Sequence, residues 1–441
     1  MRHFRFSILI ATALFVAIPA LLEAQENHER FDKFFYNKTL RVDFYHCGSN
    51  TSEFYCFDEM IEEPFFAGSK ESLINPFDYG MQMFKLFDTA TGELIYKNNY
   101  CTLFTEWQCT PEAHQTTKAM PEGIVIPYPK KEARLEIYSR GVKTGTWEKK
   151  FEYIIHPDSY FIRPFKPKYE VFDITVNGPS EHCVDIVLLP EGFAAGDRED
   201  FEKACTKWSN ALFHYAPFSQ YKQKFNIRAV WVPSPQSGVS IPGQGIWKET
   251  AMKAHFYTFD SERYQMTEDF QRVRDLAANA PYDYVYILSN TDKYGGGGIY
   301  NFYGLSSTKN AASSEKVYVH EFGHQLLGLG DEYVEENNTT SDMYYPGVEP
   351  YEANLTNLTH FDKKWKSMLP KGTVIPTPMD TIGSARDMSK WKLGVYEGGG
   401  YMSKGMYRPM PNCMMNIIHT IDEFCPVCQK AIRDYLDYMC K

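Results

Sequence analysis

The sequence predicts a two-domain chain of the α+β or α/β class, in which an N-terminal antiparallel β-sandwich precedes an α/β domain. A length of 441 residues is enough for two domains of ordinary size. Hydrophobic residues make up 43% and aromatic residues 16% of the chain, which is ample for packed cores. The hydrophobic period changes after residues 157–167, a segment rich in proline and aromatic residues. We therefore expect the domains to span residues 25–165 and 166–441.

The β-sandwich is predicted by apolar and polar residues that alternate at 40–44, 81–86, 133–138 and 147–154. A period of two is typical of strands with one buried face. Turn signals such as Ala-Thr-Gly-Glu at 90–93 separate these stretches. Short strands at this spacing favour two packed antiparallel sheets, and nothing in the region has catalytic spacing.

The second domain is predicted by strands that alternate with helices. Continuous apolar runs at 184–189, 225–232 and 284–288 indicate buried strands, and amphipathic patterns at 199–213 and 267–279 indicate helices. This order is typical of an α/β domain.

The N-terminus has the features of a secretory signal peptide over residues 1–24. Arg2 and Arg5 form a positive head, residues 6–22 are apolar, and Ala24 offers a small residue for cleavage. The alternative is an uncleaved membrane anchor, for which the apolar run is short. We expect an exported protein, in the periplasm, at the cell surface or secreted, that has no membrane partner after signal removal.

Charge and cysteine content narrow the partners and the compartment. A formal net charge of −10 argues against nucleic acid as a partner. Ten cysteines in an exported chain predict disulfides. Their positions form local groups, at 47 and 56, 101 and 109, 183 and 205, and four near the C-terminus. For Cys425 and Cys428, a structural bridge is favoured over a redox pair or half of a zinc knuckle.

One segment carries metal chemistry. Ser313, Ser314 and Glu315 are predicted to open a helix that ends at Gly328, and within it lie His320, Glu321 and His324. Residues four apart share one helix face, so both imidazoles can bind one zinc ion. Glu321 is offset around the helix, where it can take a proton from a zinc-activated water as general base. The alternative is two histidines that are hydrogen-bonded on a core helix.

A catalytic zinc site needs a third protein ligand. A helix cannot present one seven residues after His324 unless it ends, and Gly328 and Gly330 permit the chain to turn back. Asp331 is the expected ligand and Glu332 the second choice. A later acid, Glu349 or Glu352, is the remaining alternative.

These residues resemble a known family. The segment is similar to the metzincin pattern HExxHxxGxxH/D, with one extra residue before the glycine and Asp as third ligand. The variant HEFGHxxxGLxDEY resembles the bacterial IgA-peptidase-type zinc metallopeptidases, as do stretches at 188–193, 217–219, 225–227 and 397–415. The resemblance covers most of residues 170–430, and the preceding domain is similar to the β-rich domain often attached to that family. It implies a metzincin-like zincin catalytic domain, a zinc metalloendopeptidase, and a protein or peptide substrate.

The resemblance also implies further site residues. Metzincins carry a methionine turn beneath the zinc site, and Met415 is the expected base, with Met414 as the alternative. They bind substrate along an edge strand, which residues 294–300 with Gly297 and Gly298 would supply, unless this is an ordinary flexible loop. Tyr407 is a candidate for holding the oxyanion.

Two other functions compete with peptide hydrolysis. One is a catalytically inactive zincin-like module that binds glycan or protein, which the intact set His320, Glu321, His324 and Asp331 argues against. The other is a zinc-dependent amidase that acts on non-peptide bonds with the same ligands. The sequence does not specify the oligomeric state.

Overall fold

The computed structural model describes residues 29–310, 314–335, 343–379, 392–416 and 423–441. The expected signal peptide and the capping residue Ser313 lie outside these described residues. Among the described helices, none is both long and apolar enough to cross a membrane.

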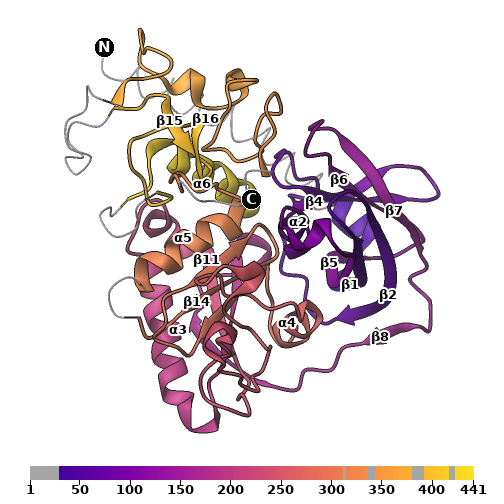
Figure 1. Cartoon of the computed structure of the whole chain (residues 1–441). Coiled ribbons are helices and arrows are strands. Elements are labelled where there is room, and N and C mark those ends of the chain that lie inside the picture. The colour runs from indigo at the N-terminus through magenta and orange to yellow at the C-terminus, as the bar shows by residue number, and fades with distance from the viewer. Residues whose placement is uncertain (1–28, 311–313, 336–342, 380–391, 417–422) are drawn as a thin grey trace, which may run out of the picture.

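The N-terminal region is β-rich, as predicted, and consists of two four-stranded sheets (Figure 1). One sheet has the order β5-β1-β2-β8, and the other has the order β4-β3-β6-β7. Neighbours pair antiparallel, except that β8 runs parallel to β2. Apolar side chains from both sheets form one shared core. The strands are β1 (Phe35–Gly48), β2 (Glu53–Glu63), β3 (Gln82–Asp88), β4 (Leu94–Tyr100), β5 (Lys118–Pro129), β6 (Ala133–Arg140), β7 (Trp147–Ile155) and β8 (Ile162–Pro164).

A six-stranded mixed sheet follows, with the order β13-β14-β12-β10-β11-β9. Its four inner strands are parallel, whereas β9 and β13 are antiparallel edge strands. Strands β10 and β12 are buried along their whole length, and β11 is buried except at Arg228 and Trp231, which explains their continuous apolar runs. The strands are β9 (Glu170–Thr175), β10 (Val184–Glu191), β11 (Phe225–Trp231), β12 (Tyr284–Ser289), β13 (Gly296–Ile299) and β14 (Tyr303–Ser307). The three predicted strands of this region are confirmed as β10, β11 and β12.

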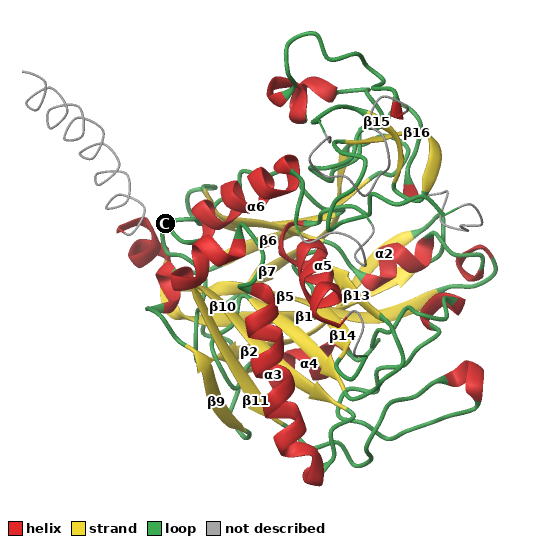
Figure 2. Cartoon of the chain, turned by 90° about the vertical axis from the view of Figure 1, so that its left-hand side faces the viewer, coloured by secondary structure: helices red, strands yellow, loops and turns green. Residues whose placement is uncertain are grey.

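Helices pack around this sheet. Helices α3 (Arg198–Leu212) and α5 (Ser314–Leu327) contact each other and the sheet, and both lie in front of the strands in Figure 2. Trp208 of α3 joins them, because its ring packs on Tyr286 of β12 and Phe322 of α5. Helix α4 (Phe270–Ala277) contacts β10 and β5, so it lies between the two regions (Figure 1). Helices α3 and α4 confirm the two predicted helices within a few residues.

The C-terminal segment returns to the sheet and to the N-terminal region. It contains the hairpin β15 (Tyr396–Gly399) and β16 (Met402–Arg408), then α6 (Pro426–Met439). Helix α6 contacts α5, and Tyr438 donates its hydroxyl hydrogen to the Ser72 carbonyl at 2.6 Å. Short helical elements complete the chain: α2 (Leu103–Gln108), η1 (Glu112–His114), η2 (Ser180–His182), η3 (Ala195–Asp197), η4 (Phe218–Lys224), η5 (Pro242–Gln244), η6 (Thr258–Asp260), η8 (Phe361–Lys363) and η9 (Trp365–Met368).

The expected disulfides are absent, because no disulfide joins any of the ten cysteines in the structure. Cys47 and Cys56 lie close enough to interact across β1 and β2, without a bond between their sulfurs. Cys205 is fully buried in the core on α3. Cys425 and Cys428, for which a structural bridge was favoured, instead gather with Cys413 around Glu332.

A buried ion cluster joins the N-terminal region to the second sheet. The Arg41 guanidinium on β1 contacts Asp43 at 3.0 Å, Glu63 at 3.4 Å, and Asp275 of α4 at 2.7 Å. Arg41, Asp43 and Glu63 are at most 2% exposed. Tyr282, just before β12, donates to Glu63 at 3.0 Å. The cluster therefore links the two regions through three buried charges on the N-terminal side and through Asp275, whose side chain is 39% exposed.

We predict that Arg41→Ala lowers the free energy of unfolding by about 3–5 kcal/mol, because it leaves buried carboxylates without their cation. Arg163→Ala is the control, since Arg163 forms an exposed ion pair with Glu59 at 3.0 Å. This control is expected to cost about 0–1 kcal/mol. Urea unfolding followed by fluorescence measures the free energy of unfolding of both variants. Equal decreases in the two variants would show that the buried cluster stabilises the fold no more than an exposed ion pair does.

Candidate active site

Helix α5 carries His320, Glu321 and His324, and its end determines what else can approach them. Gly328 has a φ of +67°, a left-handed conformation that favours glycine. Its N–H donates to the His324 carbonyl at 2.8 Å, which closes the helix as an αL cap. A Cβ at this position would also lie 3.0 Å from the Tyr351 ring. The chain consequently reverses at Gly328 and brings Asp331 back to the histidines.

The two imidazoles and the Asp331 carboxylate converge on one point. The Nε2 atoms of His320 and His324 are 3.1 Å apart, and they lie 3.1 Å and 3.3 Å from Asp331 Oδ1. Three tetrahedral ligands with bonds of roughly 2.0–2.1 Å to zinc would lie about 3.3–3.4 Å apart. The triangle formed by the three atoms therefore fits one zinc ion.

Hydrogen bonds fix which imidazole nitrogen faces this point. Nδ1 of His320 donates to the Met414 carbonyl at 2.9 Å, and Nδ1 of His324 donates to the Leu329 carbonyl. A carbonyl oxygen only accepts, so each Nδ1 carries the proton and each Nε2 can offer a lone pair. This pattern, in which the remote nitrogen is held by a backbone carbonyl, is usual for histidines that bind metal.

The electrostatics of the three residues favour a cation between them. Burial opposes charge on Asp331, yet the two histidines hold its pKa well below the usual range. Burial also lowers the pKa of His324, but Asp331 outweighs burial and raises this pKa to about 9. Without a metal ion, the cluster therefore binds a proton strongly at His324, and a metal ion can take the place of that proton.

Tyr401 completes the surroundings of Asp331. Its hydroxyl donates to Asp331 Oδ2, so the carboxylate is held from the side opposite the histidines. Backbone hydrogen bonds also join the turn at 400–401 to the segment 331–333. The Gly400 N–H donates to the Asp331 carbonyl at 2.7 Å, and the Tyr401 N–H donates to the Tyr333 carbonyl at 3.0 Å. Tyr401 lies in the stretch 397–415, but no local pattern singles it out, because its contact with Asp331 depends on this turn.

Glu321 is partly buried beside the two imidazoles, and burial raises the pKa of its carboxyl while both histidines oppose that rise. The edge strand β13 passes over this residue. A Cβ on Gly298 would lie 2.2 Å from the Glu321 carbonyl oxygen, and one on Gly297 would lie 2.5 Å from Met266 Sδ. These glycines therefore have a packing reason in addition to the predicted role in substrate binding.

The two methionines near residue 414 have different surroundings. Met414 offers its carbonyl to His320, whereas Met415 Sδ would lie 3.0 Å from a Cβ on Gly323, in the helix turn between the two histidines. Both methionine side chains are fully buried. The Met415 sulfur thus packs against α5, where Gly323 leaves room for it, and the methionine turn itself stays a prediction.

The other candidate residues lie apart from the triangle. Glu332 faces three cysteines, Glu349 accepts a hydrogen bond from the His360 N–H at 2.9 Å, and Glu352 accepts one from Tyr344 at 3.0 Å. Tyr407 on β16 is joined to Thr356 by two backbone hydrogen bonds. The structure therefore brings Asp331, and none of these acids, to the histidines.

One acidic residue near the site comes from the N-terminal region. Glu106 of α2 accepts a hydrogen bond from Tyr264 and interacts electrostatically with His324, Glu321 and Asp331. Burial raises its pKa to about 7. No sequence pattern around Glu106 indicates a catalytic role. Only the packing of the N-terminal region against the second sheet brings Glu106 close to the histidine cluster.

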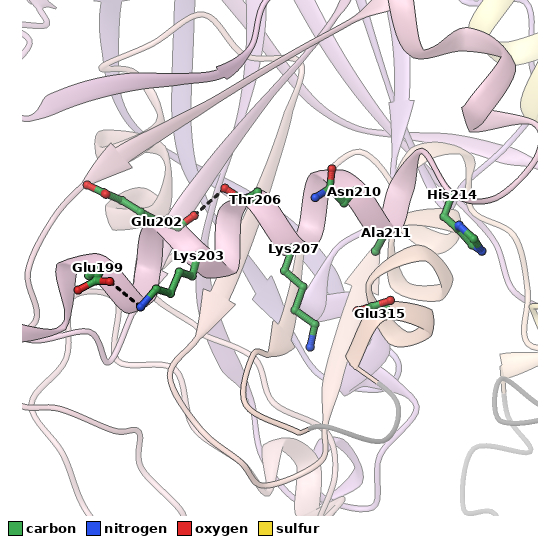
Figure 3. A pocket seen from close by; sticks show the side chains of 9 residues that line it. All are labelled: Glu199, Glu202, Lys203, Thr206, Lys207, Asn210, Ala211, His214 and Glu315. Carbon is green, nitrogen blue, oxygen red and sulfur yellow. Dashed lines mark hydrogen bonds and ion pairs between the residues drawn. The ribbon is translucent and has the colours of Figure 1, made fainter.

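A surface hollow of about 600 Å³ lies elsewhere, along the exposed side of α3 (Figure 3). Its lining is mostly charged, with Glu199 and Lys203 paired at 2.6 Å, and Glu315 at the start of α5 completes it. No residue of the histidine cluster lines it. It is the solvated face of a helix.

Fold and site together define a mixed α/β protein with a cluster of two histidines and an aspartate that could hold a metal ion. Residues 172–388 and 380–436 match the family described as IgA Peptidase M64. Residues 30–152 match the family described as Peptidase M64 N-terminus. The chain belongs to the IgA Peptidase M64 family and is a peptidase, a hydrolase of protein or peptide substrates. A search of curated proteins gives no match.

We predict that Tyr401→Phe weakens zinc binding by about 10–100-fold, since it removes the hydrogen bond that orients Asp331. Tyr407→Phe is the control, because Tyr407 lies on β16, apart from the triangle, and is a half-buried tyrosine of the same hairpin segment. Competition with a chromophoric chelator measures the zinc dissociation constant of each variant. Equal affinity in Tyr401→Phe and the unchanged protein would contradict a supporting role for this hydroxyl.

Proposed function

We propose that this peptidase is an exported zinc-dependent endopeptidase, with zinc held by His320, His324 and Asp331 and with Glu321 as general base. The observation that carries the proposal is the triangle of two Nε2 atoms and Asp331 Oδ1, with edges of 3.1–3.3 Å. Nitrogen and carboxylate donors suit zinc, and a set of three protein ligands is typical of catalytic rather than structural zinc sites. The candidate metal group is consistent with a metallopeptidase family.

Bound zinc would supply Lewis acidity, which lowers the pKa of water and polarises the carbonyl of the scissile bond. Glu321 then takes a proton from the attacking water and delivers it to the leaving amine. Its raised pKa supports this role, because a carboxylate in a partly buried place binds a proton more readily than one in water. Glu321 is next to a ligand in sequence but is not part of the triangle, so it remains available for proton transfer.

The substrate is proposed to be an extended peptide. Strand β13 is an edge strand whose residues 296–299 are mostly glycine, and it packs against α5 beside Glu321. A peptide that pairs with such an edge would place its backbone close to the site. The amidase and binding-module alternatives predict different results: an amidase would cleave a small amide and leave a denatured protein intact, and a binding module would cleave neither.

We predict that Glu321→Gln keeps its zinc and loses peptidase activity by about 10²–10⁴-fold, because the base is removed and the ligands remain. Glu315→Gln is the matched control, since Glu315 is an exposed acid in the first turn of the same helix. Zinc content and cleavage of a denatured protein are measured in parallel. Wild-type turnover in Glu321→Gln would exclude Glu321 as the base.

Export is proposed from the positive head, the apolar run and Ala24 of the first 24 residues. We predict that the chain, expressed with these residues in a bacterium, is recovered outside the cytoplasm and begins at Gln25. Fractionation and N-terminal sequencing measure this. A chain that starts at Met1 and sediments with membranes would favour the uncleaved anchor.

A further inference from the structure

A second cluster of metal-binding side chains lies next to the candidate active site in the chain. The sulfurs of Cys413, Cys425 and Cys428 and the carboxylate of Glu332 lie within 4.8 Å of one another. All four side chains are buried, and the largest exposed fraction among them is 4%. Three thiols and a carboxyl group gathered in a dry core are unfavourable unless something compensates them.

The distances fit a four-ligand site better than a disulfide. Cys413 Sγ and Cys428 Sγ are 3.8 Å apart, and Glu332 Oε1 lies 3.4 Å from Cys428 Sγ and 4.0 Å from Cys425 Sγ. Around a tetrahedral zinc, with about 2.3 Å to sulfur and 2.0–2.2 Å to oxygen, neighbouring ligands would lie about 3.5–3.8 Å apart. A disulfide would need about 2.05 Å between sulfurs, and all three cysteines are free.

The local backbone favours negative charge on two of the three sulfurs, those of Cys413 and Cys425. Cys425 N–H donates to Cys413 Sγ at 3.1 Å, and Cys428 N–H donates to Cys425 Sγ at 3.5 Å. Cys425 is the N-cap of α6 and Cys428 lies in its first turn, at the positive end of a 14-residue helix. Hydrogen bonds to sulfur stabilise a thiolate, which is the form that binds metal.

The Glu332 carboxylate points into the same cluster with one oxygen unused. Asn354 donates to its Oε1 at 2.9 Å, whereas its buried Oε2 has no hydrogen-bond partner. A buried carboxylate oxygen without a partner is rare in native proteins, and here that atom is Oε2, whereas Oε1 is the atom that faces the sulfurs of Cys425 and Cys428.

We infer that the chain holds a second, structural zinc ion, bound by Cys413, Cys425, Cys428 and Glu332. Thiolate ligands select zinc over magnesium, calcium and manganese, which prefer oxygen. Four protein ligands close the site, so its role is to hold the fold rather than to activate water.

This ion would hold the two segments that build the histidine cluster. Glu332 follows Asp331 directly, and its N–H donates to the Met415 carbonyl at 2.7 Å. Cys413 precedes Met414, whose carbonyl holds His320. A zinc ion bound by Glu332, Cys413 and α6 would therefore fix the position of Asp331 and the orientation of His320 from behind.

The test is zinc stoichiometry in the full chain, purified with a reductant and supplied with zinc. The unchanged protein is expected to hold two zinc ions per chain, and His320→Ala/His324→Ala is expected to hold one. Cys428→Ser is expected to lose the second ion and to unfold at a lower temperature. Cys205→Ser is the matched control, since Cys205 is an equally buried thiol outside the cluster, and it should hold both ions. Cobalt in the double-histidine variant should give the near-ultraviolet band of thiolate ligation.

The outcomes separate this inference from the proposed function. One zinc ion in the unchanged protein and none in the double-histidine variant would overturn the second site and leave the active-site proposal intact. One ion in both proteins would support the second site and overturn zinc at the histidines. Because the double-histidine variant keeps all three cysteines, the result does not depend on whether Cys428→Ser folds. Cobalt bound there without a thiolate band would also overturn the inference.

Discussion

The end of helix α5 at Gly328 is the constraint on which the candidate site depends. Two histidines four residues apart can supply two ligands of a metal site. An uninterrupted helix would carry the following residues away from these two side chains, so it could not present a third ligand. The left-handed glycine stops the helix one turn after His324, and the chain returns with Asp331. The same reversal brings the Leu329 carbonyl to His324 Nδ1. The approach of Asp331 and the tautomer of His324 thus follow from a single backbone conformation.

The segment after the reversal serves two clusters at once. Asp331 faces the histidines, and its neighbour Glu332 faces the cysteines. Backbone hydrogen bonds join this segment to the turn at 400–401 and to Met415, so it is held on both sides. These hydrogen bonds fix a short loop at the place where Asp331 meets the histidines.

The N-terminal region is more than an attached domain. Arg41 shares its buried charge with α4, Tyr438 of α6 bonds to Ser72, and Glu106 contributes charge close to His324. These contacts connect the sandwich-like sheets with the elements that carry the site. The conformation of the site therefore depends on packing between segments that are hundreds of residues apart in the chain.

The sequence by itself determined the β-rich N-terminal region, the strands β10, β11 and β12, the helices α3 and α4, and the spacing of His320, Glu321 and His324. These features are local, because hydrophobic period and helical spacing are set within a few residues. Tertiary structure decided the rest: that Asp331 and not Glu332 meets the histidines, that Tyr401 holds it, and that Cys413 joins Cys425 and Cys428 without a disulfide. The physical reason is that such contacts depend on where the chain turns and which segments pack together, and spacing along the chain does not encode distances between segments.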